Sequence, residues 1–394
     1  MRKAIRILFI GELNSSHALS WIDLLSPFKE EFEIQGLHTS QAPPPKVTFQ
    51  IINIRLNDFE LFLSKYISLN YQYNNLPYIH GYGRCRHRQF LKIDHLLKSF
   101  KPHIVHTLGI FPASVFFLKA LALNSAICRS VWIVQARGGP DMALNHNIPE
   151  LKTEIKAILG RCDYFIADNQ NNYSIAQGLG LPAHKISEIG CVPGTGGVDH
   201  MMFAGVPLPS KKDRLILWPK AYNCIQCDGL AVVEALRLAL PRIGEFHLIA
   251  SAAIPDVEYW FKAFLGSYGS RVKIHDRLPR EQLLEIYKTA RVLLAPSLSD
   301  GVPNSMYEAM ASHTVPILSP LETLLPLFYN NIHTIYAPNL EPPCIADALV
   351  CAMNNDVLAD SIANTNRTLL PLLAGREAIR ERVITMYKKY CRYA

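Results

Sequence analysis

Short runs of aliphatic residues alternate with helical patterns along the whole chain, and this alternation limits the possible folds more than any other feature. A continuous apolar run of about four to eight residues is typical of a buried strand. Such strands, each followed by a helix, predict a parallel sheet covered on both faces. In the first half we expect strands at Ile5–Ile10, Val47–Ile54, Ile104–Thr107, Val131–Gln135, Tyr164–Ala167 and Ile186–Ile189, and helices near 17–28, 88–100, 113–124, 150–160 and 170–179.

The same pattern restarts after residue 210, which predicts a second domain of the same kind. Its expected strands are Leu215–Trp218, Phe246–Ala250, Val272–His275, Val292–Ala295, Val315–Leu318 and Thr334–Tyr336, and its expected helices lie near 228–240, 256–267, 280–289, 304–312 and 342–354. Residues 190–213 form a long stretch rich in glycine, proline and polar residues, so we place the linker there.

A chain of 394 residues is long enough for two domains of ordinary size. We expect an N-terminal domain at 1–200 and a C-terminal domain at 201–370. The tail, 371–394, has a helical pattern, and we expect it to pack back on the N-terminal domain. A helix lying on a membrane surface is the alternative for this tail.

Composition agrees with two packed domains and argues against several other classes of protein. Hydrophobic residues make up 49% of the chain and charged residues only 19%, which argues against disorder. The net charge of +7 is too small to indicate a nucleic-acid binder. It suits either a mildly basic surface or contact with an anionic membrane or a phosphate-bearing acceptor. The longest apolar region, Leu108 to Ile127, is interrupted by Pro112, Lys119 and Asn124 and does not predict a membrane span.

Cysteine usage indicates a reducing compartment. The nine cysteines are scattered and odd in number, so no disulfide framework is implied. Cys224 and Cys227 form a lone C-x-x-C without the second pair that a zinc site needs, so we expect free thiols. The N-terminal apolar run contains Arg6 and has no cleavage site typical of a signal peptide. We therefore expect a cytoplasmic protein.

Two carboxylates of the second half, Asp300 and Glu308, follow an expected strand, with Asp300 on the loop and Glu308 inside the next expected helix. Ligands of parallel sheets bind outside the carboxyl ends of the strands. Gly301 allows the backbone to approach a ligand closely. We expect Asn304 to cap the next helix, whose free amides would then attract phosphate. A carboxylate beside a phosphate cradle suits a ligand with both hydroxyls and phosphates, such as a nucleotide sugar.

Residues 296–310, Pro-Ser-x-x-Asp-Gly-x-Pro-Asn-x-x-x-Glu-Ala-Met, resemble the E-x7-E signature of retaining family 4 glycosyltransferases, here as Asp300-x7-Glu308. Weaker similarities to the same family are found at Pro102–His106, Val192–Phe203 and Gly229–Leu236. The resemblance implies an α/β chain with the GT-B fold: two facing Rossmann-like, doubly wound parallel-sheet domains with a C-terminal helix crossing back.

The resemblance also implies a reaction. A sugar would move, with retention of configuration, from a nucleoside diphosphate donor of the UDP or GDP type to a glycan or lipid-linked acceptor. Such a reaction belongs to the synthesis of cell-surface polysaccharide or lipopolysaccharide. Two alternatives stay open: a nucleotide-sugar epimerase of the same fold, and a catalytically degenerate glycan-binding subunit.

The resemblance assigns roles to residues of the second domain. Glu308 would accept hydrogen bonds from the donor ribose, and Asp300, one methylene shorter than the usual Glu, would lie near the transferred sugar. Lys220 takes the place of the family's phosphate-binding Arg, although it lacks the bidentate grip. The remaining donor-binding candidates are Gly301 and Val302, through their backbone amides, with Pro303 and Asn304.

One position of the second domain departs from the family pattern. Where the family has a second phosphate-binding Lys, this chain has Asp228, which repels phosphate. Lys211, Lys212 and Arg277 are the other candidate cations. An Asp-x-Asp pair is not found at an expected strand end, so we expect neither a catalytic metal nor a cofactor.

In the first domain, the turn at Arg137-Gly138-Gly139-Pro140-Asp141 resembles the family's His-Gly-Ser-Asp turn. Arg137 is a candidate catalytic residue that would meet phosphate or a sugar hydroxyl. The candidates for the acceptor or phosphate side are Gly11, Ser16, His17, Gly138 and Asp141. His106 lies within an apolar strand and is expected to be a core histidine. The basic segment 83–92 suits either contact with the acceptor or with the inner membrane face, or a solvated helix start.

Overall fold

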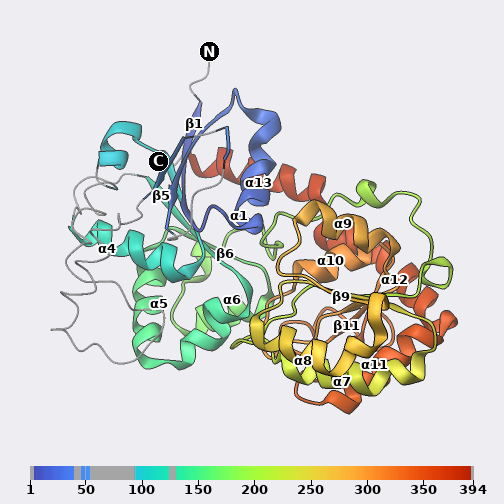
Figure 1. The fold of residues 1–394 in the computed structure, drawn as a ribbon. Coiled ribbons are helices and arrows are strands. Elements are labelled where there is room, and N and C mark those ends of the chain that lie inside the picture. The colour runs from blue at the N-terminus through green and yellow to red at the C-terminus, as the bar shows by residue number, and fades with distance from the viewer. Residues whose placement is uncertain are drawn as a thin grey trace.

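The computed structural model describes residues 4–39, 46–48, 50–53, 93, 95–123 and 130–391. These residues form two α/β units, each built on a six-stranded parallel sheet (Figure 1). The strand orders are β3-β2-β1-β4-β5-β6 and β12-β11-β10-β7-β8-β9. If β7–β12 are renumbered from one to six, the second order read in reverse is the same as the first. The predicted fold class, two doubly wound Rossmann-like sheets, is confirmed.

The first sheet contains β1 (Ile5–Gly11), β2 (Phe32–His38), β3 (Gln50–Asn53), β4 (Ile104–Leu108), β5 (Val131–Ala136) and β6 (Tyr164–Ala167). Its helices include α1 (Ser16–Ile22), α4 (Val115–Leu123), α5 (Pro149–Arg161) and α6 (Gln170–Gly178), and residues 95–100 are helical. Strand β2 was not predicted. The strand predicted at Ile186–Ile189 is wrong, because only Ile186 pairs with the sheet, through one isolated bridge to Phe165.

The second sheet contains β7 (Leu215–Trp218), β8 (His247–Ala250), β9 (Val272–Ile274), β10 (Val292–Leu294), β11 (Val315–Leu318) and β12 (Ile335–Tyr336). Its helices are α7 (Gly229–Ile243), α8 (Pro255–Leu265), α9 (Arg280–Thr289), α10 (Asn304–Ala311) and α11 (Pro342–Asn354). Each of these elements overlaps the range that the sequence predicts.

Each sheet is buried on both faces, as the continuous apolar strands require. In β7, Leu215 and Leu217 belong to one buried cluster, whereas Ile216 and Trp218 belong to the cluster on the opposite face. Helices α7, α8 and α11 cover one face of this sheet, and α9 and α10 cover the other. Each fully buried Leu or Ile stabilises the fold by about 1.5–3 kcal/mol relative to an exposed one.

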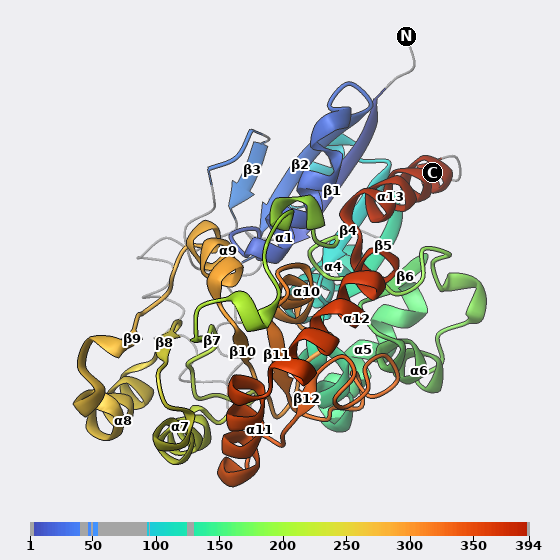
Figure 2. The ribbon, with the colours of Figure 1, turned by 90° about the vertical axis from the view of Figure 1, so that its right-hand side faces the viewer.

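The C-terminal helices return the chain to the first unit. Helix α12 (Asp356–Ala374) packs on the second unit, and after Gly375 helix α13 (Arg376–Tyr390) lies against the first sheet (Figure 2). The Tyr387 hydroxyl accepts a hydrogen bond from Trp21 Nε1 at 3.1 Å and lies 2.6 Å from His106 Nδ1. His106 is fully buried there as a core residue, and burial holds its pKa well below the usual value.

The crossing point is tied to the linker by backbone hydrogen bonds. The Val198 amide donates to the carbonyl of Ala374 at 2.8 Å, and the Arg376 amide donates to the carbonyl of Val198 at 3.2 Å. The two segments that connect the units therefore run together. Within the part of the chain that the structure describes, no helix combines the length and the hydrophobicity needed to cross a bilayer.

Candidate active site

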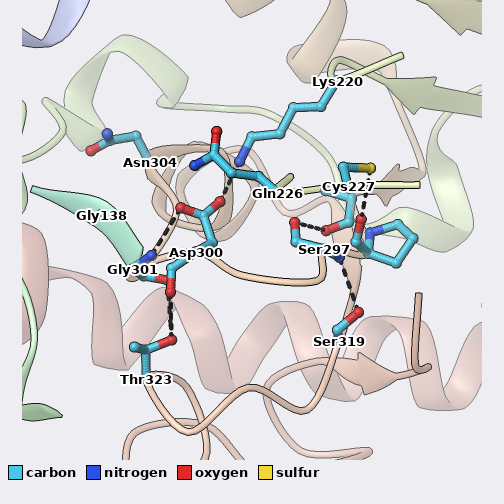
Figure 3. Close-up of polar contacts among 12 residues, drawn as sticks. Gly138, Lys220, Gln226, Cys227, Ser297, Asp300, Gly301, Asn304, Ser319 and Thr323 are labelled. Carbon is cyan, nitrogen blue, oxygen red and sulfur yellow. Dashed lines mark hydrogen bonds and ion pairs between the residues drawn. The ribbon is translucent and has the colours of Figure 1, made fainter. Parts of the chain in front are cut away.

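The two central strands of the second sheet bring Lys220 and Asp300 together. Strands β7 and β10 pair in parallel, and the strand order reverses between them, which is where ligands bind in doubly wound sheets. Lys220 follows β7 and Asp300 follows β10. Lys220 Nζ lies 2.5 Å from Asp300 Oδ2 (Figure 3). Although burial lowers the pKa of Lys220, the charge of Asp300 raises it above the usual value, so this lysine is a permanent cation.

The loop after β10 is held in place by hydrogen bonds from neighbouring residues. The Ser297 amide donates to Ser319 Oγ at 3.0 Å, and Thr323 Oγ1 donates to the carbonyl of Asp300 at 2.9 Å (Figure 3). The Gly301 amide donates to Asp300 Oδ1 at 2.9 Å. These bonds fix the Asp300 carboxylate at the edge of the sheet where the strands have their C-terminal ends.

A hairpin at Cys224–Cys227 forms hydrogen bonds with the same loop from the other side. The two cysteines exchange backbone hydrogen bonds, and the carbonyl of Gln226 accepts from the amides of Leu298 and Ser299 at 2.7 and 3.3 Å. Both thiols are free, as the sequence predicts. Among the described residues, no three His, Cys, Asp or Glu side chains are arranged to hold a metal ion.

Glu308 lies on α10 and faces the same site. Its side chain is only 12% exposed, and Oε1 lies 2.9 Å from the guanidinium of Arg280, the first residue of α9. Burial raises the pKa of Glu308, and the charges of Arg280 and Lys220 oppose this shift. Arg280 was not among the predicted residues. No local spacing could have indicated it, because it meets Glu308 only through the packing of two helices.

The predicted cap at Asn304 is wrong. Helix α10 starts at Asn304 itself, after Pro303, and no side chain caps its amides. The Asn304 amide group turns instead to the linker and the first unit. Its Oδ1 accepts from Thr195 Oγ1 at 2.8 Å, and its Nδ2 lies 3.3 Å from His17 Nδ1. Val302 belongs to a buried core cluster and Pro303 is buried, so a role of Val302 in donor binding would rest on its backbone amide.

Asp228, which departs from the family pattern, caps α7. Its Oδ1 accepts from the amides of Leu230 and Ala231, both at 3.0 Å. A carboxylate therefore occupies the helix end that would otherwise offer its amides to phosphate.

Lys212, one of the predicted substitute cations, has a structural role. Its Nζ is surrounded by the carbonyls of Tyr287, Ala290 and Ser312 and by the hydroxyl of Thr314, at 2.5–3.2 Å. Burial lowers the pKa of Lys212 to about 7. The other two candidates are exposed: Lys211 ends a short 3-10 helix (Pro209–Lys211), and Arg277 lies on a loop.

Of the predicted residues of the first unit, His17 contacts Asn304 of the second unit, whereas the Arg137 side chain turns back to its own strand. His17, on the first turn of α1, is accessible to solvent. Enclosure by the protein lowers its pKa to about 4, helped by the charges of Arg137 and Lys220. Its ring is therefore neutral at neutral pH. Arg137 donates to Gln135 Oε1 through Nε and Nη2, at 3.3 and 2.9 Å, and burial lowers its pKa to about 10.

The other predicted residues of the first unit shape its loops. Gly11 ends β1, where a Cβ would lie 3.1 Å from the carbonyl of Leu108. Ser16 starts α1, but the neighbouring Ser15 provides the cap. Asp141 accepts hydrogen bonds from the amides of Ile110, Phe111 and Arg137, so its carboxylate orders the turn at 137–141.

Asp168 is a site residue that sequence reasoning missed. It follows β6, is buried, and accepts from the Gly138 amide at 2.9 Å and from Asn172 Nδ2 at 3.0 Å. Burial raises its pKa to about 6, and the charge of Asp300 adds to this shift. A carboxylate of the first unit thus lies close to the loop that carries Asp300.

Known proteins share this architecture. Residues 229–355 match the family described as "Glycosyl transferases group 1", a range that includes Asp300 and Glu308. Sucrose-phosphate synthase from Thermosynechococcus elongatus is 15% identical, with a TM-score of 0.71 over 99% of this chain and 100% of that one. Anabaena HepE, solved in complex with UDP, is 12% identical, with a TM-score of 0.68 over 98% and 100%.

The same fold also occurs in a putative UDP-N-acetylglucosamine 2-epimerase from Listeria monocytogenes, which is 12% identical, with a TM-score of 0.65 over 100% of this chain and 98% of that one. A search of curated protein sequences finds no match. At these identities the structures establish the fold. Together with the family match over the second unit, they support a glycosyltransferase with the GT-B fold.

Proposed function

We propose that this chain is a retaining glycosyltransferase that moves a sugar from a nucleoside diphosphate donor to a glycan or lipid-linked acceptor. The observation that carries the proposal is the pair of carboxylates at the switch point of the second sheet, each with its own cation. Asp300 lies 2.5 Å from Lys220, and Glu308 lies 2.9 Å from Arg280. A site with carboxylates for hydroxyls and cations for phosphates suits a nucleotide sugar.

In this proposal Glu308 accepts hydrogen bonds from the donor ribose, because an ionised carboxylate can accept from two hydroxyls at once. Lys220 turns from Asp300 to the diphosphate as negative charge develops on the leaving group. A cation at the leaving group stabilises such charge. Asp300 then faces the transferred sugar and stabilises the positive charge that develops at the anomeric carbon of that sugar. The UDP bound by HepE supports UDP as the first nucleotide to test.

The acceptor side would come from the first unit. The neutral ring of His17 lies near the charge of Asp300 and beside Asn304, and it suits a hydroxyl group of an acceptor. In this proposal the guanidinium of Arg137, which donates to Gln135, is a second donor for acceptor hydroxyls. The basic segment 83–92, which lies outside the described residues, is the part of the chain that we expect at an anionic membrane surface or a lipid-linked acceptor. We place the reaction at the cytoplasmic side, in the synthesis of a cell-surface glycan.

The proposal is tested with a panel of UDP-, GDP- and ADP-sugars, by measuring donor hydrolysis and transfer to glycan acceptors. Replacing Glu308 with Ala should weaken donor binding by about 1.5–3 kcal/mol, since it removes charge-assisted hydrogen bonds. Glu258→Ala is the matched control, because Glu258 pairs with Lys262 on the exposed surface of α8. Unchanged binding and turnover in Glu308→Ala would show that the assignment is wrong. NMR of the anomeric proton of the product reports retention or inversion.

The epimerase alternative is measured in the same panel. An epimerase converts the donor sugar when no acceptor is present, whereas a transferase returns the free nucleotide and the transferred or hydrolysed sugar. A degenerate glycan-binding subunit would do neither. Thermal stabilisation by UDP or GDP argues against that alternative, because a ligand that binds only the folded state raises the melting temperature.

A further inference from the structure

We infer that Arg280 is a positioning residue that keeps the Glu308 carboxylate ionised and aimed at the donor. This inference rests on the proposed function, in which Glu308 binds the donor ribose. Neither the spacing of the motif nor its resemblance to known enzymes assigns a role to Arg280. It comes from another helix, and the ion pair forms only in the folded chain.

The two acidic residues of the motif, Asp300 and Glu308, each form an ion pair with a different cation. Lys220 lies against Asp300 at 2.5 Å, so its charge is already engaged there. Arg280 Nη2 lies 2.9 Å from Glu308 Oε1, and the two side chains are 33% and 12% exposed. Glu308 is therefore the more enclosed member of its pair. A buried carboxylate that loses its only close cation tends to become neutral by binding a proton.

Tyr287 provides a second, independent observation at this site. It lies on α9 two helical turns after Arg280, so both side chains project from the same face of the helix. Its hydroxyl is fully buried and has no hydrogen-bond partner among the described residues. The charges of Glu308 and Arg280 both act on it. The described residues thus leave a buried polar group unsatisfied near the ion pair, and the loss of Arg280 would change the charge around it.

Among the residues that the structure describes, few charged or titratable groups act on Glu308. Arg280 and Tyr287 come from α9, and Lys220 comes from the loop after β7. Burial raises the pKa of Glu308, and the two cations counter this shift. When Arg280 is removed, only the already engaged Lys220 remains, so the pKa of Glu308 should rise further. A protonated carboxyl loses acceptor capacity toward ribose hydroxyls.

The test is the binding of UDP, GDP and ADP, measured by calorimetry between about pH 6 and pH 8.5. We expect Arg280→Met to bind about tenfold or more weakly at the low end of this range and to recover toward wild type at the high end, since Glu308 ionises there. Arg280→Lys should keep the wild-type pH profile with a smaller loss, because it retains the charge without the planar fork.

A double-mutant comparison separates positioning from direct contact. Glu308→Gln should bind weakly at every pH, and Arg280→Met combined with Glu308→Gln should bind no more weakly than Glu308→Gln alone. Arg242→Met is the matched control, since Arg242 pairs with Asp347 on the exposed surface of the second unit. It should leave nucleotide binding unchanged.

Two results would overturn the inference while leaving the proposed function intact. One is an Arg280→Met variant that binds as wild type does across the pH range. The other is a loss that is independent of pH and adds to that of Glu308→Gln, which would mean that Arg280 contacts the ligand directly. If the wild-type chain binds none of the three nucleotides, the proposed function fails, and the donor role of Arg280 fails with it. Urea unfolding of wild type, Arg280→Met, Glu308→Gln and the double variant, without nucleotide and over the same pH range, still tests whether Arg280 keeps Glu308 ionised. A stability loss in Arg280→Met that does not change with pH would contradict it.

Discussion

Gly301 of the second unit and Gly138 of the first approach each other so closely that a Cβ on Gly301 would lie 2.9 Å from the Cα of Gly138. The next residue of the first unit is equally close: a Cβ on Gly139 would lie 2.8 Å from the amide of Asp300. Backbone therefore meets backbone where the two units join. The loop that carries Asp300 is seated directly on the turn that follows Arg137.

Replacing Gly301 with Ala should force these two loops apart, because the added methyl group would meet the Asp168 carboxylate and the Cα of Gly138. We expect the rate of sugar transfer to fall by about tenfold or more, since a small misplacement of reacting groups is costly. The folded second unit should persist, as judged by circular dichroism.

Gly160→Ala is the control for this substitution. Gly160 lies in α5 with no atom near the added methyl group, so Ala there should be neutral or stabilise the protein by about 0.5–1 kcal/mol. A Gly301→Ala variant with wild-type turnover would mean that the close approach is not needed for activity.

Lys220 should be needed for donor binding more than for folding. We expect Lys220→Met to weaken UDP or GDP binding roughly 10–100-fold, since a charge-assisted bond contributes about 1.5–3 kcal/mol. The partner acid would be left unpaired, so the free energy of unfolding should also fall by about 1–3 kcal/mol. Calorimetry with the nucleotide and urea unfolding measure the two effects separately.

Adding Asp300→Asn to Lys220→Met tests the pair. The second substitution removes the unpaired charge, so it should restore part of the stability without restoring nucleotide binding. Recovery of binding in the double variant would contradict a role of Lys220 as a ligand of phosphate.

Much of the fold could be predicted from the sequence because parallel strands buried on both faces are continuous apolar runs. Strands β7 and β11 occur at the predicted residues. Strand β2, Phe32–His38, was missed because Glu33 and Gln35 interrupt its apolar residues. The segment at Ile186–Ile189 has the composition of a strand, but it only touches the edge strand β6 at one residue.

The site could be predicted only where its residues share one local segment. Asp300 and Glu308 belong to one loop and helix, so their spacing could be read directly. Arg280 and Asp168 come from other elements and reach the site only through the packing of the folded chain. The spacing of residues along the sequence does not indicate such contacts. The predicted cap at Asn304 is wrong for the same reason, because a distant donor, Thr195, takes up its side-chain oxygen.

The stability of the protein should depend on the protonation of Asp168. Burial raises its pKa from 3.8 to about 6, so the folded state binds a proton more tightly than the unfolded state does. Stability from this group is therefore fully present below about pH 4 and is lost as the pH rises through about 6. Relative to wild type, Asp168→Asn should gain thermal stability between these two pH values. A melting-temperature difference that does not change with pH would contradict this.

Asp228 offers a direct test of why this chain departs from the family pattern. Its carboxylate caps α7 by accepting from the amides of Leu230 and Ala231. Asp228→Lys removes the cap and places a positive charge at the positive end of the helix, so we expect a loss of about 0.5–2 kcal/mol in the free energy of unfolding. The same change puts a cation where the family has its phosphate-binding Lys, so nucleoside diphosphate affinity should rise.

Asp228→Asn separates these two effects because Asn also caps helices well. It should keep the stability of the wild-type protein and show little gain in nucleotide affinity. Urea unfolding and calorimetry with UDP on the three proteins give the comparison. If Asp228→Lys is as stable as wild type, the cap does not contribute to the fold. If it loses stability and gains no affinity, the helix end at Asp228 lies outside the phosphate site, and the diphosphate must rely on Lys220 and the cations of the first unit.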